Sequence, residues 1–193
     1  LGRARAMTNV INIHGLRIER GTKVILSGID FQIAEGSFVA IVGPNGSGKT
    51  SILKTLLGLM NPYEGELSRC GQSLVKLSPR ERSSYIAWLP QKDFTAEPMA
   101  VLDFVMTSRY RFRESTSDSI EAAKKALQRV DMIHMKDRFV STLSGGECQR
   151  VSLACLLAQS APILLVDEPG NHLDPGQQLQ VYMLLGELWR EGK

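Results

Sequence analysis

The sequence predicts an α/β fold with a β-rich N-terminal portion and a helical insertion, and three observations favour that class. Apolar and polar residues alternate over about the first forty positions, as in strands with one buried face. FVAIV at 38–42 is a continuous apolar run, and ILLVDE at 163–168 is an apolar run that ends in an acidic pair; both are typical of buried strands. Between about 95 and 140 the apolar spacing becomes helical.

The elements of the N-terminal portion follow in order. VINIHGLRI, KVIL and GIDFQIA predict short strands, and FVAIV predicts a buried one. SILKTLLGLM has helical spacing and should end near Gly58, because a proline follows at Pro62. GELSRCG and SYIAWL are two further strand candidates. This portion therefore contributes most of the predicted strands.

Helices dominate the remainder. VLDFVMTS and DSIEAAKKALQRV are helical in pattern, a helix should begin at Ser144, and ILLVDE should be a buried strand before a final amphipathic helix. The chain ends at Lys193, straight after that helix. Because a helix in an α/β layout is normally followed by a strand, we expect the C-terminal part of the fold to be missing and the last helix to be loosely held.

Composition excludes several classes of protein. The 193 residues suit one domain, and 43% hydrophobic with 22% charged residues is ordinary for a globular chain. A net charge of +3 is too small to indicate nucleic acid or lipid as a partner. No apolar run approaches the roughly 18 residues of a spanning helix. The three cysteines have neither metal nor redox spacing, which favours a reduced, cytoplasmic chain.

GPNGSGKT at 43–50 is the first motif that carries chemistry. It fits the phosphate-loop pattern and lies between a predicted strand and a predicted helix, the context that such a match requires. Glycines let backbone N–H groups turn toward phosphate oxygens, and the helix adds its positive N-terminal end. Lys49 can reach the β- and γ-phosphates, and Thr50 can ligate Mg²⁺. A phosphate-loop nucleotide site is therefore predicted.

The acidic pair after ILLV has two interpretations. At the end of an apolar strand, Asp167 can bind Mg²⁺, and Glu168 can activate the attacking water. An acidic pair after a strand is also ordinary turn chemistry. The phosphate loop upstream favours the catalytic interpretation.

LSGGECQR at 143–150 contains a predicted helix start. Ser144 and Glu147 have the spacing of a capping box, which is a purely structural role. Gly145 and Gly146, however, leave the first N–H groups of the helix uncovered, and uncovered N–H groups bind anions. A second phosphate site in a chain that already has one suggests that two copies meet, each completing the site of the other.

The phosphate loop, LPQ, LSGGE, LLVDEP and NHLD occur in the order and spacing of the ATP-binding-cassette (ABC) ATPases, and the chain resembles that family over almost its whole length. The resemblance implies one nucleotide-binding domain over 1–193, incomplete at its C-terminus, with a helical subdomain at about 95–160. It also implies a head-to-tail dimer that holds two ATP molecules.

The resemblance assigns roles to individual residues. Glu168, Lys49 and Gln91 would be catalytic, while Thr50, Gln91 and Asp167 would bind Mg²⁺. The ATP-binding set combines the phosphate loop, a base contact and the signature: Gly43, Pro44, Asn45, Gly46, Ser47, Gly48, Lys49, Thr50, Arg20, Ser144, Gly145, Gly146 and Glu147. The loop joining the two active sites would be Asn171, His172, Leu173 and Asp174.

Several positions depart from the family pattern. Arg20 stands where an aromatic residue often stacks on adenine, although a guanidinium can also stack on a base. Glu147 replaces the usual signature glutamine, and Gly170 stands where threonine is common. The switch histidine has no counterpart before Lys193, so slow turnover is expected of a chain that ends there.

LSGGECQRVSLA and MAVLDFVMTSRYRF resemble importers of iron chelates, haem and cobalamin. That implies an ATPase on the inner face of the cell membrane, bound to a separate permease, with no nucleic-acid partner. The alternative is a non-transport ABC clamp or regulator acting on soluble protein or nucleic acid. SRYRFRE at 108–114 is interpreted as a solvated or permease-facing patch, with nucleic-acid contact as the other possibility.

We predict that Arg20→Ala weakens ATP binding by about 0.5–2 kcal/mol, the strength of a cation–π contact. Turnover at saturating ATP should stay near the parental rate, because the base lies away from the reacting phosphate. Titration with ATP, alongside turnover measurements, checks both parts. Equal ATP affinity in parent and variant would mean that Arg20 does not hold the base.

Overall fold

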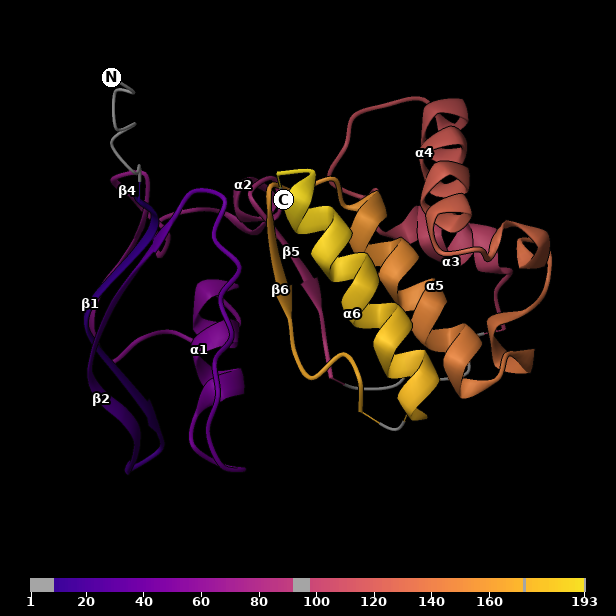
Figure 1. Ribbon diagram of the computed structural model, residues 1–193. Helices are drawn as coiled ribbons and strands as arrows, with labels where there is room; N and C mark the ends of the chain where they lie inside the picture. The colour runs from indigo at the N-terminus through magenta and orange to yellow at the C-terminus, as the bar shows by residue number, and fades with distance from the viewer. Residues whose placement is uncertain (1–8, 92–97, 172, 193) are drawn as a thin grey trace, which may run out of the picture. The chain divides into compact units, whose positions relative to one another are not determined.

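The computed structural model describes residues 9–91, 98–171 and 173–192. The chain divides into two compact units, Leu1–Arg82 and Ser83–Lys193, called here the N-terminal unit and the C-terminal unit. Within the described residues each unit has its own sheet (Figure 1).

The N-terminal unit is built on a four-stranded antiparallel sheet in the order β2-β1-β3-β4. Its strands are β1 (Asn9–Arg20), β2 (Lys23–Ala34), β3 (Glu64–Arg69) and β4 (Gln72–Ser73). The alternating pattern at the N-terminus thus forms two long paired strands, where the sequence predicted shorter ones. The predicted strand GELSRCG is confirmed as β3.

A bulge keeps the apolar side of β1 facing the core. Ile11 and Ile13 are buried, and after the bulge Leu16 and Ile18 are buried instead of the odd-numbered residues. The β1–β2 register shifts between Ile13 and Leu16, and Gly15 between them has φ 58. Because side chains alternate strictly along a strand, one inserted residue is what restores the apolar face.

Helix α1 (Lys49–Leu56) buries Ile52, Leu53 and Leu56, so its apolar spacing has the predicted role. The chain leaves the helix at Gly58, as predicted, with φ 70. A side chain there would collide with the buried guanidinium of Arg82 in α2 (Pro79–Ser83), since an added Cβ would lie 1.6 Å from Nη1. Glycine at this position therefore permits both the turn and the packing of Arg82.

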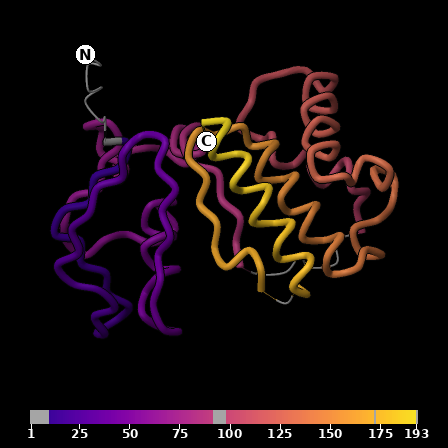
Figure 2. The backbone as a smooth tube through the Cα atoms, in the orientation of Figure 1, coloured from indigo at the N-terminus to yellow at the C-terminus, as the bar shows by residue number. Residues whose placement is uncertain are grey.

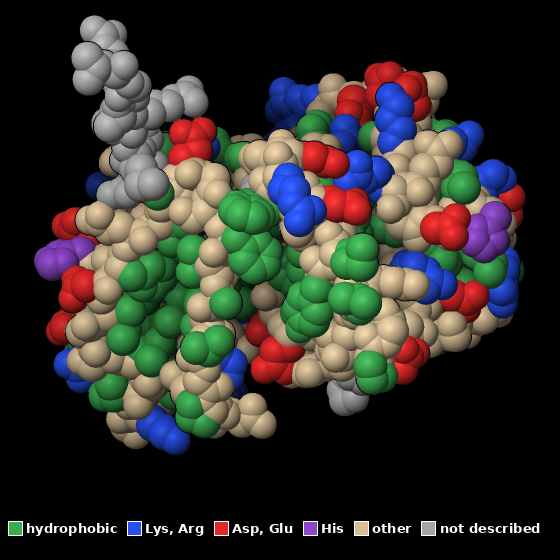
Figure 3. Space-filling view, viewed as in Figure 1, with side chains coloured by type: hydrophobic (Ala, Val, Ile, Leu, Met, Phe, Trp, Pro, Cys, Tyr) green, Lys and Arg blue, Asp and Glu red, His purple; other side chains and the backbone are tan. Residues whose placement is uncertain are grey.

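The strand predicted at 38–42 is absent, which corrects the sequence analysis. Residues 37–44 have no regular structure, and among the described residues this segment joins neither sheet. Phe38 is 57% exposed and Val42 is 86% exposed. Hydrophobic side chains gather on a face of the N-terminal unit (Figure 3). An apolar run forms a buried strand only where a neighbouring strand accepts its backbone hydrogen bonds, and neither sheet provides one here.

The C-terminal unit combines a parallel strand pair with helices. Strands β5 (Ile86–Leu89) and β6 (Ile163–Val166) confirm the runs SYIAWL and ILLVDE. The helices are α3 (Val101–Thr107), α4 (Thr116–Arg129), α5 (Gly145–Ala158) and α6 (Pro175–Arg190), with short 3-10 turns η1 (Ile133–Met135) and η2 (Val140–Thr142). Helices α5 and α6 lie side by side next to the β5–β6 pair (Figures 1 and 2). The predicted lower boundary of the helical subdomain, near 95, falls outside the described residues.

One hydrophobic core joins these helices to the strand pair. Val101 and Val105 of α3, Leu127 of α4, and Val151 and Leu156 of α5 all belong to it.

Helix α6 adds three buried side chains to that core. Val181 is 4%, Leu185 8% and Leu188 3% exposed. The expectation that the last helix is loosely held is therefore wrong on the buried side of α6, where its apolar stripe packs into the shared core.

The segment 108–114 is only partly the solvated patch that its charges suggested, because Tyr110 and Arg113 are exposed whereas Arg109 is not. Arg109 is buried, binds Glu114 through two hydrogen bonds and donates from Nη1 to the carbonyl oxygen of Ala158 at 2.8 Å. Arg111 donates to the carbonyl oxygen of Gln159 at 2.7 Å. Both guanidinium groups lie over the ring of Phe112, at 3.6 and 3.9 Å from its centroid. The two cations thereby cap the C-terminal end of α5, where the helix dipole favours positive charge.

The ion pair is strong enough to shift the titration of its acid. Hydrogen bonds from Arg109, followed by one from Ser119, lower the pKa of Glu114 to about 2. Because this folded-state pKa is depressed, the stabilisation is fully present above the ordinary glutamate range and is lost as pH falls toward 2.

We predict that Arg109→Met lowers the free energy of unfolding of the C-terminal unit by about 1–3 kcal/mol, because it leaves buried acceptors without their donor. Urea unfolding followed by tryptophan fluorescence measures this, since both tryptophans, Trp88 and Trp189, lie in that unit. Arg113→Met is the matched control, because Arg113 is exposed in the same segment. Equal midpoints for the two variants would contradict the capping role.

Candidate functional site

The phosphate loop lies in the N-terminal unit and has the backbone that its glycines predict. Gly46 has φ 79 and Gly48 has φ 95, both in the left-handed region. An added Cβ at Gly48 would also lie 2.8 Å from Cγ of Leu26, and one at Gly43 would lie 2.9 Å from Oγ of Ser47. Glycine is thus required by conformation and by space. The backbone N–H of Ser47 donates to the carbonyl oxygen of Pro44 at 3.2 Å and closes the loop.

Lys49 begins helix α1 and bends back over the loop. Its Nζ donates to the carbonyl oxygens of Gly43 and Pro44, at 2.9 and 3.1 Å. The first turn of α1 contains no acidic residue. The positive end of the helix and the lysine cation therefore act together on the same loop, which suits a bound polyphosphate.

Arg20, the proposed base contact, is the last residue of β1. It is exposed and pairs in register with Lys23 across the turn. Its neighbour Gly21 has φ 62. The side chain is accessible in the N-terminal unit, and its contact with a base stays a prediction.

The acidic pair lies at the end of a parallel strand pair in the C-terminal unit. Leu89 of β5 is in register with Val166 of β6, and the N–H of Asp167 extends the ladder to the carbonyl oxygen of Leu89 at 3.0 Å. Asp167 is 4% exposed, and its Oδ2 has no hydrogen-bond partner in the part of the chain that the structure describes. A buried carboxylate oxygen without a partner is costly, and a cation or a hydrogen-bond donor would satisfy it.

Glu168 and Gln91 meet because each lies two residues beyond the registered pair. Nε2 of Gln91 donates to Oε2 of Glu168 at 2.5 Å, and the side-chain amide of Asn171 donates to the same oxygen. Among the described residues no hydrogen bond reaches Oε1 of Glu168. The structure thus brings together three residues singled out from the sequence and leaves one carboxylate oxygen open.

Helix α5 begins at the signature, as predicted. Ser144 and Glu147 form the capping box: the N–H of Ser144 donates to Oε2 of Glu147 at 2.7 Å, and the N–H of Glu147 donates to Oγ of Ser144 at 3.4 Å. The hydrogen bonds that the N–H and then the hydroxyl of Ser144 donate to the carboxylate of Glu147 lower its pKa. Gly145 has open space beside it, whereas Gly146 is buried.

The burial of Gly146 corrects half of the expectation that both glycines are uncovered. A Cβ at Gly146 would lie 2.2 Å from Nε2 of Gln177. Gln177 belongs to the first turn of α6, so the two helix starts pack against one another. Of the two signature glycines, Gly145 stays uncovered.

The proposed connecting loop has mainly local roles in the structure. Asn171 contacts Glu168, Asp174 caps α6 by accepting from the N–H of Gln177 at 3.0 Å, and Leu173 is half-buried. His172 lies outside the described residues. Sequence reasoning missed Gln149 and Gln178, whose amides donate to the carbonyl oxygens of residues 169, 170 and 173. The available signal was a glutamine near the start of each of two apolar helices.

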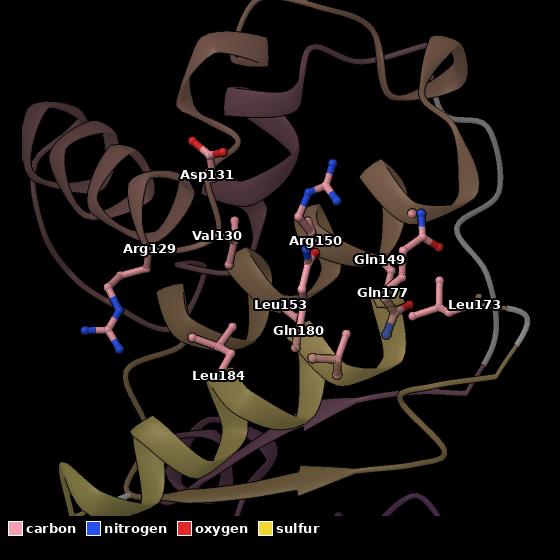
Figure 4. A pocket seen from close by; sticks show the side chains of 12 residues that line it. Arg129, Val130, Asp131, Gln149, Arg150, Leu153, Leu173, Gln177, Gln180 and Leu184 are labelled. Carbon is pink, nitrogen blue, oxygen red and sulfur yellow. The ribbon is translucent and has the colours of Figure 1, made fainter. Parts of the chain in front are cut away.

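A pocket of about 350 Å³ lies beside these residues, between α4, α5 and α6. Gln149, Gln177 and Leu173 lie near one another at one end, and Arg129 lies at the other (Figure 4). Arg129 is engaged with Glu191 at 2.9 Å.

Residues 26–171 match the ABC transporter family. The chain belongs to that family. A dimeric ATP-binding cassette in a post-hydrolysis state with ADP and Pi has the same fold, with a TM-score of 0.83 and 27% identity over 95% of this chain and 84% of that one. The predicted ABC ATPase fold and the ATPase class are therefore confirmed.

Two curated relatives of this ABC ATPase are importer subunits. The probable iron chelatin transport ATP-binding protein of Helicobacter pylori (strain ATCC 700392 / 26695) is 38% identical over 86% of this chain and 67% of its own length. The hemin import ATP-binding protein HmuV of Nocardia farcinica is 37% identical over 94% of this chain and 66% of its own length. The chain thus spans about two thirds of each. In its described residues, no helix combines the length and the hydropathy that crossing a membrane requires.

We predict that Lys49→Ala in this ABC ATPase weakens ATP binding by at least about 1.5–3 kcal/mol, the strength of one hydrogen bond to a charged group. The variant loses the cation that faces the β- and γ-phosphates. Calorimetric titration with ATP measures the loss, and a melting curve measures what the bonds to Gly43 and Pro44 add to stability. Lys54→Ala, on the same helix, is the control. Parental ATP affinity in the Lys49 variant would rule out the phosphate-loop assignment.

Proposed function

We propose that this chain is the ATP-hydrolysing subunit of an importer that takes up an iron chelate, haem or a related metal chelate. The observation that carries the catalytic part is the contact of Gln91 with Glu168 at the ends of two paired parallel strands. The substrate class is supported by the two relatives, whose names give iron chelatin transport and hemin import. The partners would be a second copy, head to tail, and a permease, with this subunit on the inner face of the cell membrane.

Glu168 is suited to orient and deprotonate the attacking water. Gln91 and Asn171 both donate to Oε2, so Oε1 can accept from a water molecule. Because two donors hold one oxygen, the carboxylate keeps a fixed direction. Phosphoryl transfer depends mostly on positioning and on stabilising charge, so this fixed carboxylate supplies what the reaction needs.

Magnesium fits the residues of the C-terminal unit. Oδ2 of Asp167 is buried without a partner among the described residues, and a cation would satisfy it. Mg²⁺ in nucleotide sites binds one or two carboxylates together with the substrate phosphates. Asp167 would therefore hold it, with Gln91 of the same unit as a further ligand assigned from the sequence. When bound, Mg²⁺ neutralises charge on the β- and γ-phosphate oxygens.

We predict that Glu168→Gln lowers ATP hydrolysis by at least about a hundred-fold, the usual contribution of a general base. Binding of ATP should persist, because the amide keeps the shape of the carboxylate. Phosphate release at saturating MgATP and the dissociation constant for ATP measure the two separately. Glu121→Gln, an exposed glutamate paired with Lys125 on α4, is the control. Hydrolysis at the parental rate in the Glu168 variant would remove Glu168 as the base.

The transport role has its own readout. Cells that carry Glu168→Gln in place of the parental protein should accumulate less iron from an iron chelate or from haem. Unchanged uptake of both, with hydrolysis lost, would contradict the substrate class and leave the ATPase assignment standing. Copurification with a polytopic membrane protein would support the permease partner.

A further inference from the structure

The turn after β6 has a backbone that needs support. Glu168 has φ 49, in the left-handed region where its Cβ crowds the following carbonyl oxygen. Such a conformation in a residue other than glycine persists only where the surrounding structure holds it. The N–H of Asn171 donates to the carbonyl oxygen of Glu168 at 3.2 Å. This bond closes the turn but does not fix the carbonyl groups that follow.

Two glutamine side chains bind those carbonyl groups from two different helices. Nε2 of Gln149, just after the first turn of α5, donates to the carbonyl oxygen of Pro169 at 2.8 Å. Nε2 of Gln178, in the first turn of α6, donates to the carbonyl oxygens of Gly170 and Leu173, both at 3.1 Å. Three carbonyl groups of one short loop thus accept from two amides, which fixes the direction of each peptide plane.

The loop has little room to rearrange. Gly170 is buried, and a Cβ at this position would lie 3.2 Å from Oη of Tyr182 and 3.3 Å from Cγ of Gln178. If a glutamine donor were removed, its acceptor would lose a partly buried partner with few ways to replace it. The loop would then relax, and the left-handed residue Glu168 at its start would be the first to change.

We propose that Gln149 and Gln178 are positioning residues for ATP hydrolysis. By holding the carbonyl groups of residues 169, 170 and 173, they keep Glu168 in its left-handed conformation and its carboxylate against Gln91 and Asn171. The proposal rests on the role of Glu168 proposed above. Neither glutamine touches the reacting atoms; each acts through the backbone that carries Glu168.

The position of Gln149 also links the loop after β6 to the signature. Gln149 lies two residues after Glu147, on the helix whose first turn is the signature. A shift of this helix start therefore moves a donor that holds Pro169. Gln177 differs from its neighbour Gln178: its side chain packs on Gly146 and lines the pocket (Figure 4).

Leucine and glutamate replacements test the two residues in the full chain. Gln149→Leu and Gln178→Leu remove the donor at similar volume, and Gln149→Glu and Gln178→Glu keep the shape as isosteric carboxylates that accept but do not donate. Each should lower kcat about ten-fold or more, because small displacements of a catalytic group are costly. The KM for ATP should stay within about two-fold, because the two glutamines position Glu168 and do not contribute to substrate binding.

Gln180→Leu is the matched control, because Gln180 is an exposed glutamine on α6; its kcat should be parental. All rates are to be measured well below each variant's melting temperature. If the leucine variants do not fold, the isosteric glutamate variants carry the test. Parental kcat in folded variants at both positions would overturn the proposal. So would a loss of ATP affinity that accounts for the whole loss of kcat/KM.

A double variant separates positioning through Glu168 from a general structural effect. In a Glu168→Gln background, Gln149→Leu and Gln178→Leu should cause no further loss of kcat, because the group that they position is gone. A further ten-fold loss in that background would overturn the proposal. If the proposed role of Glu168 is itself wrong, the Glu168→Gln variant alone will hydrolyse ATP at the parental rate, which distinguishes the two cases.

Discussion

The parallel pairing of β5 with β6 is the constraint on which the candidate site depends. It sets Leu89 opposite Val166 and leads both strands to the same edge. Because the chain continues outward from both strand ends, Gln91 and Glu168 arrive together although they are 77 residues apart. Asp167, one residue earlier, keeps its carboxylate buried. Slipping the register by one residue would exchange the buried Asp167 and the half-buried Glu168.

Helix α5 is held by hydrogen bonds at both of its termini. Its N-terminus is capped by the reciprocal bonds of Ser144 and Glu147, while its C-terminal carbonyl groups accept from Arg109 and Arg111. Satisfying both ends keeps a largely apolar helix in one position. The signature motif and the segment 108–114 therefore hold opposite ends of the same helix, although they lie far apart in the sequence.

Polar side chains within this unit act mainly on backbone groups. Gln149 and Gln178 hold the loop after β6, and Gln159 accepts from the N–H of Trp88 at 3.2 Å. Such bonds contribute little net free energy but are expensive to leave unmade. They therefore select one arrangement of loops around an apolar core that would tolerate several.

The sequence by itself determined the features that depend on residues a few positions apart. Local chemistry accounts for the glycine-dependent phosphate loop, the capping box at Ser144, the end of α1 near Gly58 and the strand ILLV, and each is present. Tertiary structure alone decided that Arg109 reaches Ala158 across 49 residues, that Gln149 reaches Pro169 across 20, and that 38–42 joins neither sheet among the described residues. The physical reason is that turns and caps are closed by neighbours along the chain, whereas burial and long-range hydrogen bonds depend on which elements become neighbours in space.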